Sequence, residues 1–151
     1  MAERYHNVTW PALRRDALAL AARLEARGPW RGLVAVSRGG LIPAALVAQA
    51  LDIRLIETLG IASYAGEARG EARLLKAPLA AGDGEGFAVI DDLVDSGATA
   101  ALVRALLPRA CFATLYAKPQ GAALADLFVA AVSQETWIVF PWDTPPEQPP
   151  F

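Results

Sequence analysis

Charged residues are scarce in this 151-residue sequence, and neither sign dominates. Only 20% of the residues are charged, the formal net charge is -2, and 54% of the residues are apolar. A chain of this length and composition can bury a core of its own, which excludes a disordered segment and indicates one compact domain. Because basic residues are not in excess, nonspecific electrostatic binding to nucleic acid is also disfavoured.

Cysteine occurs only once, so no internal disulfide can form. Cys111 lies in an apolar run, which predicts a buried thiol in a reducing cytoplasm.

The polar residues 1–7 contain no apolar segment, and no secretion signal is visible. In the long apolar stretch 33–51, Arg38 would cost about 2.5–3.5 kcal/mol at a membrane centre, so a strand, a turn and a helix are expected instead. We therefore expect a soluble, cytoplasmic protein.

Two common nucleotide-binding motifs are also absent. No Gly-x-x-x-x-Gly-Lys-Ser/Thr segment is present, which argues against a P-loop nucleotidase. Gly82, Gly84 and Gly86 only partly follow the spacing of a dinucleotide-binding loop, and they precede an expected strand instead of following one.

Short apolar segments alternate with helical patterns along the chain. Thr9 is placed to cap a helix that ends before Gly28-Pro29, and further helices are expected at 43–51 and 99–107. Strands are expected at 32–36, 53–61, 87–90 and 111–117, and less clearly at 128–132 and 137–140. This alternation predicts an α/β fold with a central, mostly parallel sheet flanked by helices.

A single domain, residues 1–151, is expected to carry two irregular segments. Small and polar residues dominate from residue 63 onwards, and a long loop in a small domain is usually a lid or a binding loop. We expect a flexible loop at 63–81 that closes over the substrate. Residues 133–151 are expected to form a small C-terminal hood and a proline-rich tail that cannot be helical.

Two adjacent acids follow the apolar strand at 87–90. Asp91 and Asp92 would lie at the carboxyl end of a parallel strand, where open α/β sheets bind ligands. Two neighbouring carboxylates are costly to bury unless a cation or hydroxyl donors share the site, and a magnesium ion and a ribose diol would supply both. Ser96, Gly97 and Thr99 then open a helix whose free amides suit a phosphate.

The segment 89–99 resembles the phosphoribosyl-pyrophosphate motif of type I phosphoribosyltransferases. Residues 5–143 are similar, in matching order, to the bacterial xanthine-guanine phosphoribosyltransferase family. The stretches that carry this resemblance are Val8-Thr9-Trp10, residues 35–41, residues 82–87, Ala117-Lys118-Pro119, Thr136-Trp137-Ile138 and Pro141-Trp142-Asp143. The resemblance implies the type I phosphoribosyltransferase fold. It also implies a purine salvage enzyme that joins the phosphoribosyl group of 5-phosphoribosyl 1-pyrophosphate to N9 of xanthine or guanine, and more weakly of hypoxanthine.

The resemblance further implies how phosphoribosyl pyrophosphate is held. Arg38 and Gly39 would bind pyrophosphate through a guanidinium fork and an open amide, after a cis Ser37–Arg38 peptide. Asp91 and Asp92 would face the ribose hydroxyls, with Asp92 in contact with Mg²⁺, and residues 95–99 would cradle the 5′-phosphate. The full predicted set is Arg38, Gly39, Arg69, Asp91, Asp92, Leu93, Val94, Asp95, Ser96, Gly97, Ala98 and Thr99.

For the base, the resemblance implies contacts with Asp95, Lys118, Trp137 and Ile138. Asp95 would accept the N7 proton, and Arg38 with Mg²⁺ would neutralise the leaving pyrophosphate, so that Asp95, Arg38 and Lys118 are the predicted catalytic residues. Lys118 can only donate, which suits O6 of a 6-oxopurine and rejects the amino group of adenine. Taken alone, these residue types also fit a helix cap at Asp95, a solvated strand end at Lys118 and a core position at Trp137.

Several expectations rest on the family alone. Its loop arginine aligns with Gly70, and Arg69 is expected to take over that pyrophosphate contact. The family is tetrameric and is described as loosely bound to the inner membrane, which implies a homo-oligomer and a cytoplasmic or peripheral location.

Two alternatives stay open. One is a hypoxanthine-preferring phosphoribosyltransferase, and the other is a non-catalytic, RNA-binding regulator on the same fold. The presence of Arg38, Asp95 and Lys118 and the net charge of -2 argue against the regulator, and no nucleic-acid partner is expected.

Overall fold

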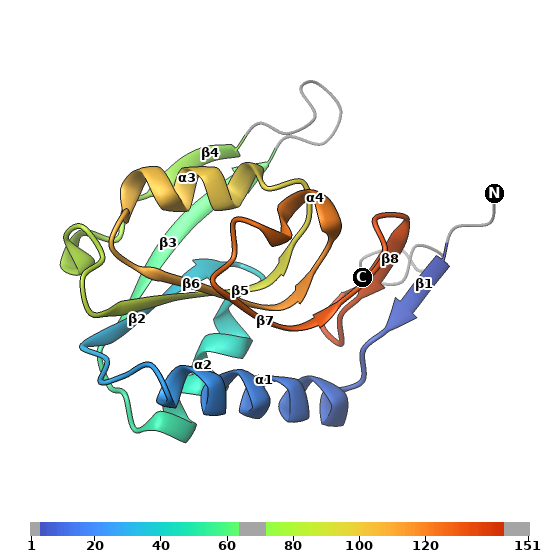
Figure 1. Cartoon of the computed structure of the whole chain (residues 1–151), viewed down its shortest axis with the longest axis horizontal. Helices are drawn as coiled ribbons and strands as arrows, with labels where there is room; N and C mark the ends of the chain where they lie inside the picture. Colours follow the sequence, from blue (N-terminus) through green and yellow to red (C-terminus); the bar gives the residue numbers. More distant parts are fainter. Residues whose placement is uncertain (1–3, 64–71, 144–151) are drawn as a thin grey trace.

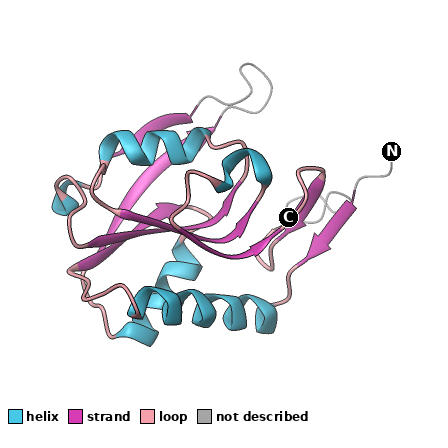
Figure 2. Ribbon diagram, in the orientation of Figure 1, coloured by secondary structure: helices cyan, strands magenta, loops and turns pink. Residues whose placement is uncertain are grey.

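The computed structural model describes residues 4–63 and 72–143, and its main sheet carries helices on both faces (Figure 1, Figure 2). The α/β fold with a mostly parallel central sheet is therefore confirmed. In chain order the elements are β1 (Arg4–Asn7), α1 (Trp10–Glu25), β2 (Gly32–Ser37), α2 (Leu41–Leu51), β3 (Ile56–Ser63), β4 (Ala72–Lys76), the 3₁₀ helix η1 (Leu79–Ala81), β5 (Phe87–Val94), α3 (Ala98–Leu106), β6 (Cys111–Ala117), α4 (Pro119–Ala122), β7 (Leu127–Ala131) and β8 (Thr136–Val139).

The order of the strands determines where a ligand can bind. The central sheet runs β4-β3-β2-β5-β6-β7, and every neighbouring pair is parallel except β3 with β4. The chain adds β3 on one side of β2 and later adds β5, β6 and β7 on the other side, so the order reverses between β2 and β5. Ligands of open α/β sheets bind outside the carboxyl ends of the strands at such a reversal. The turn after β2 and the end of β5 meet this condition.

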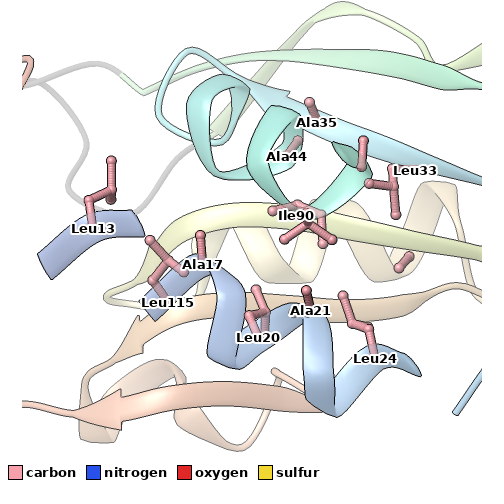
Figure 3. Packing of buried hydrophobic residues seen from close by; sticks show 14 of the residues in the cluster. Leu13, Ala17, Leu20, Ala21, Leu24, Leu33, Ala35, Ala44, Ile90 and Leu115 are labelled. Carbon is pink, nitrogen blue, oxygen red and sulfur yellow. The ribbon is translucent and has the colours of Figure 1, made fainter. Parts of the chain in front are cut away.

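Helices pack against both faces of the sheet and bury its apolar strands. Helix α1 starts where the sequence predicts, with Thr9 Oγ1 accepting a hydrogen bond from Ala12 N at 3.2 Å. Its apolar stripe and helix α2 cover one face (Figure 3), and α3 covers the other. The stripe consists of Leu13, Ala17, Leu20, Ala21 and Leu24. Strands buried on both faces give continuous apolar runs, which is why β2, β5 and β6 could be recognised in the sequence.

Strands β1 and β8 form a separate two-stranded parallel sheet, which we call the hood sheet (Figure 1). His6 pairs with Ile138 across it. Aromatic contacts fasten it to the main body, because the Tyr116 ring lies 5.9 Å from both the His6 and the Phe140 rings. Strand β1 has no counterpart among the sequence expectations, since its four exposed residues show no apolar alternation.

Two expectations about the region after β3 are wrong. The segment 63–81 is not all loop, because β4 pairs antiparallel with β3 and η1 follows. Strand β4 lies at the sheet edge and is mostly exposed, so it lacks the alternating pattern of a half-buried strand. Strand β5 continues to Val94 instead of ending at Ile90. The rest of the expected loop, residues 64–71 with Arg69, lies outside the described residues.

Two further expectations from the sequence concern the burial of Cys111 and membrane crossing. Cys111 is only partly buried, because it occupies the first position of β6. Within residues 4–63 and 72–143, no helix has the length and apolarity needed to cross a membrane.

Candidate active site

The turn after β2 lies at the reversal point of the sheet, as the predicted pyrophosphate loop should. Its Ser37–Arg38 peptide is cis, in agreement with the sequence prediction. The turn is closed by a hydrogen bond from Gly40 N to Val36 O at 2.8 Å, and Arg38 is exposed. Gly40 must be glycine because a Cβ there would lie 2.8 Å from Val36 O and 3.1 Å from the Asp91 Cα. The turn is therefore packed directly on β5.

Asp91 and Asp92 lie in the last half of β5, next to this turn. Asp91 is buried, with 7% exposure, and its Oδ1 accepts a hydrogen bond from Asp92 N at 2.8 Å. Burial, followed by the charge of Asp92, raises the pKa of Asp91 well above its ordinary value. Burial also raises the pKa of Asp92. A buried carboxyl and its partly buried neighbour, both of which resist losing their protons, form a site whose charged form is favoured by a cation.

Asp143 is a further carboxylate near the acid pair, to which the sequence interpretation gave no role. Its negative charge contributes to the raised pKa of Asp92, although burial is the larger cause. Asp143 is held in place because its Oδ2 accepts a hydrogen bond from Phe140 N at 2.9 Å. The segment that follows the hood sheet thus brings a further carboxylate towards the acid pair. The Pro-Trp-Asp stretch drew attention to this position by resemblance only, without a role.

The segment 95–99 forms the turn into α3, as predicted for a phosphate cradle. Gly97 adopts φ +94° and precedes the first residue of the helix, and Ser96 Oγ accepts a hydrogen bond from Ala98 N at 3.4 Å. The expectation that Asp95 also caps the helix is wrong, because Gly97 occupies the cap position. Leu93 and Val94 still belong to β5, and the Val94 carbonyl accepts a hydrogen bond from Lys118 N at 2.9 Å.

Asp95 and Lys118 meet at the carboxyl ends of β5 and β6. Lys118 Nζ donates to Asp95 Oδ2 at 3.1 Å. The lysine side chain is only 7% exposed and the aspartate side chain 53%, so the interpretation of Lys118 as a solvated strand end is wrong. Helix α4 packs closely against the loop that carries Asp95, since a Cβ on Gly121 of α4 would lie 2.8 Å from the Asp95 carbonyl oxygen. The pair presents an acceptor and a donor side by side.

The hood sheet carries the two remaining predicted base contacts. Trp137 is 59% exposed, so it is not a core residue, whereas Ile138 is 6% exposed and packs in the core. A second polar group that the sequence interpretation missed, Gln134, donates from Nε2 to Asp95 Oδ1 at 2.8 Å. A glutamine in a turn between two short strands has no distinguishing pattern in a single sequence.

The adjacent carboxyls of Asp91 and Asp92 fit the kind of site that holds magnesium. Among the described residues, no group of three or more His, Cys, Asp and Glu side chains is arranged to hold a metal. Magnesium in phosphate-transfer sites is usually held by one or two carboxylates together with substrate phosphates and water. Asp91 and Asp92 could supply such carboxylates, and a bound cation would give this pair a counter-charge.

Residues 9–149 match the phosphoribosyl transferase domain family. The chain is 56% identical over 145 residues to the xanthine-guanine phosphoribosyltransferase of Gluconobacter oxydans, covering 94% of this chain and 86% of the relative. It is 52% identical over 147 residues to the enzyme of that name from Nitratidesulfovibrio vulgaris, covering 95% and 89%. This chain belongs to the phosphoribosyltransferase family. The recognition of the family from the sequence is therefore confirmed, and the chain is a transferase.

Solved structures agree with this family assignment. The purine phosphoribosyltransferase from Pyrococcus horikoshii Ot3 superimposes with a TM-score of 0.79 at 28% identity, covering 97% of this chain and 99% of that one. The Helicobacter pylori xanthine-guanine-hypoxanthine phosphoribosyltransferase gives a TM-score of 0.74 at 25% identity, covering 92% and 94%. The type I phosphoribosyltransferase fold is thus confirmed.

Proposed function

We propose that this phosphoribosyltransferase serves purine salvage by transferring the phosphoribosyl group of 5-phosphoribosyl 1-pyrophosphate to N9 of xanthine or guanine. Hypoxanthine is a weaker substrate, and the products are the nucleoside monophosphate and pyrophosphate. The observation that carries the proposal is the Asp95–Lys118 pair, 3.1 Å apart beside the acid pair. A 6-oxopurine presents N7 and O6 next to each other on one edge. A carboxylate and an ammonium held side by side match a protonated N7 and an O6 acceptor.

Each residue of the pair then has one task. Asp95 Oδ2 accepts the N7 proton as N9 attacks the anomeric carbon, and Lys118 donates to O6 and so orients the ring. Burial of Lys118 makes this contact selective. With adenine, the buried ammonium would face an amino group and would have no acceptor on the base. Exposed Trp137 is available to cover a purine face, and the backbone of Ile138 is available to contact its edge.

The sugar and its phosphates are assigned to the reversal point of the sheet. Arg38 and the amide of Gly39 bind pyrophosphate, Asp91 faces the ribose hydroxyls, and the amides of 95–99 bind the 5′-phosphate at the start of α3. Asp92 would hold Mg²⁺, which, when bound, neutralises charge on the leaving pyrophosphate. Arg69 stays a predicted pyrophosphate contact that lies outside the described residues.

Steady-state rates with xanthine, guanine, hypoxanthine and adenine test the proposal. Xanthine and guanine should give the highest kcat/KM, hypoxanthine a lower value and adenine a value near background. A preference for hypoxanthine would favour the first alternative. A gel shift with RNA, without pyrophosphate release from any base, would favour the regulator.

A homo-oligomer in the cytoplasm is proposed from the family resemblance. Exposed leucines on β4 and η1, among them Leu75 at 63% and Leu79 at 84%, offer apolar surface of the kind that subunit contacts bury. Light scattering during size-exclusion chromatography gives the oligomeric state, for which a tetramer is the expectation. Attachment to the inner membrane stays an expectation of the resemblance alone.

A further inference from the structure

The turn between β7 and β8 holds Gln134 in a defined position. Ser133 Oγ and Thr136 Oγ1 share a hydrogen bond of 2.6 Å, and Thr136 N donates to Ser133 O at 3.1 Å. These bonds close the turn around Gln134, which is partly buried. Because β8 belongs to the hood sheet, the position of Gln134 follows that of the hood.

The amide of Gln134 bridges two elements of the site. Its Oε1 accepts a hydrogen bond from Gln120 N at 3.0 Å, and its Nε2 donates to Asp95 Oδ1 at 2.8 Å. The orientation of the amide is unambiguous, since the backbone N–H of Gln120 can only donate and the Asp95 carboxylate can only accept. Helix α4, which contains Gln120, begins directly after Lys118. One side chain therefore connects the helix behind Lys118 with the loop that carries Asp95.

This bridge fixes the rotation of the Asp95 carboxylate. With Oδ1 held by Gln134, Oδ2 is left to face Lys118, where the purine edge is proposed to bind. Asp95 is half exposed and does not cap a helix, so in the described part of the chain these two side chains alone restrain it. We propose that Gln134 is a positioning residue, which aims the general base Asp95 and couples its orientation to the placement of the hood sheet. This inference rests on the proposed function, since it assigns Gln134 a role through Asp95.

The first test is Gln134→Met, which keeps the side-chain volume and removes both hydrogen bonds. With saturating phosphoribosyl pyrophosphate, kcat for xanthine and guanine should fall about 10-fold to 100-fold, the range in which small displacements of catalytic groups act. The KM for phosphoribosyl pyrophosphate should change less than about twofold, because Gln134 bonds to the Asp95 side chain, whereas the 5′-phosphate is proposed to bind the backbone amides of 95–99. Gln134→Glu retains an acceptor for Gln120 N but cannot donate to Asp95 when ionised, and it should be at least as impaired. Gln49→Met, on the exposed side of α2, is the control and should leave kcat unchanged.

A double-mutant cycle separates positioning from a structural role. In an Asp95→Asn background, the general base that Gln134 positions is absent. Adding Gln134→Met should therefore lower kcat by less than about a further twofold. A full additional 10-fold loss, or wild-type kcat in Gln134→Glu, would overturn the positioning role. Unchanged kcat in Asp95→Asn alone would instead overturn the proposed function of Asp95. Thermal unfolding of each variant identifies losses that come from misfolding.

Discussion

The carboxylate of Asp92 lies directly against the backbone of Gly39. A Cβ added at Gly39 would lie 2.6 Å from Asp92 Cγ, closer than non-bonded atoms approach each other. The proposed pyrophosphate loop and the proposed metal ligand are thus in contact across β2 and β5, the strands between which the sheet order reverses. Glycine at position 39 leaves room for the acid.

Gly39→Ala should therefore impair the site more than the fold. The methyl group must push Asp92 aside, and kcat/KM for phosphoribosyl pyrophosphate should fall about 100-fold. Gly82→Ala is the matched control: a Cβ there meets no atom within 4 Å, but φ is +59°. It should cost about 1–3 kcal/mol of stability through backbone strain and leave the kcat of the folded enzyme unchanged. Initial rates and thermal unfolding of both variants check this contrast.

Removal of divalent metal should abolish activity. Asp91 is buried, the adjacent Asp92 is partly buried, and both have raised pKa values, so their charged form depends on a cation. Excess chelator should stop pyrophosphate release and added Mg²⁺ should restore it, whereas Asp92→Asn should raise the Mg²⁺ concentration needed for half-maximal rate. Asp91→Asn should raise the unfolding midpoint of the metal-free protein, because the buried carboxyl must either carry a charge or take up a proton on folding, and the amide does neither. Full activity in chelator would exclude the proposed metal site.

The layers of the fold, and the segments that form the candidate site, could be predicted from the sequence because both depend on local patterns. The apolar runs within β2, β5 and β6, and the acids followed by Ser96-Gly97, are continuous in the chain. The sequence did not predict the roles of Gln134 and Asp143 or the Tyr116–Asp16 hydrogen bond. Each is an interaction between ordinary polar side chains that lie far apart in the sequence. Strands β1 and β4 were missed because exposed edge strands show no apolar alternation.

Acid should destabilise the hairpin of β3 and β4 through Glu57. Hydrogen bonds from Lys76 Nζ, Ala80 N and Thr58 N lower the pKa of Glu57 to about 2. The folded state thus favours the carboxylate, so this stability is present above the unfolded pKa near 4.5 and is lost as pH falls towards 2. When the pH is lowered from 7 to 3, the free energy of unfolding in urea should fall less for Glu57→Gln than for the wild type. Glu25→Gln, which removes an exposed carboxylate, should follow the wild type; equal losses in all three would contradict the assignment.

The buried hydrogen bond from Tyr116 Oη to Asp16 Oδ2, 2.6 Å long, should contribute to stability. Burial and the Asp16 carboxylate raise the pKa of Tyr116, so the phenol stays a donor at neutral pH. Tyr116→Phe leaves Asp16 without this donor and should cost about 1–3 kcal/mol, whereas Asp16→Asn keeps an acceptor and should cost less. The double variant Asp16→Leu with Tyr116→Phe should recover part of the loss, since neither partner remains unsatisfied. Denaturant unfolding measures these variants together with Asp16→Leu alone, and strict additivity of Asp16→Leu and Tyr116→Phe would mean that the bond contributes nothing.

Selectivity for 6-oxopurines should depend on Lys118. The side chain is buried and its ammonium faces Asp95, so it can reach an O6 acceptor but offers nothing to the adenine amino group. Sites built on a specific hydrogen bond discriminate by roughly 10⁴–10⁵, and Lys118→Met should narrow the gap between guanine and adenine by at least about tenfold. The loss should appear as lower kcat/KM for xanthine, guanine and hypoxanthine, with the KM for phosphoribosyl pyrophosphate little changed. Lys76→Met removes a lysine that is paired with Glu57 outside the site and should leave selectivity intact. If Lys118→Met discriminates against adenine as well as the wild type does, the backbone near Ile138 must select the base.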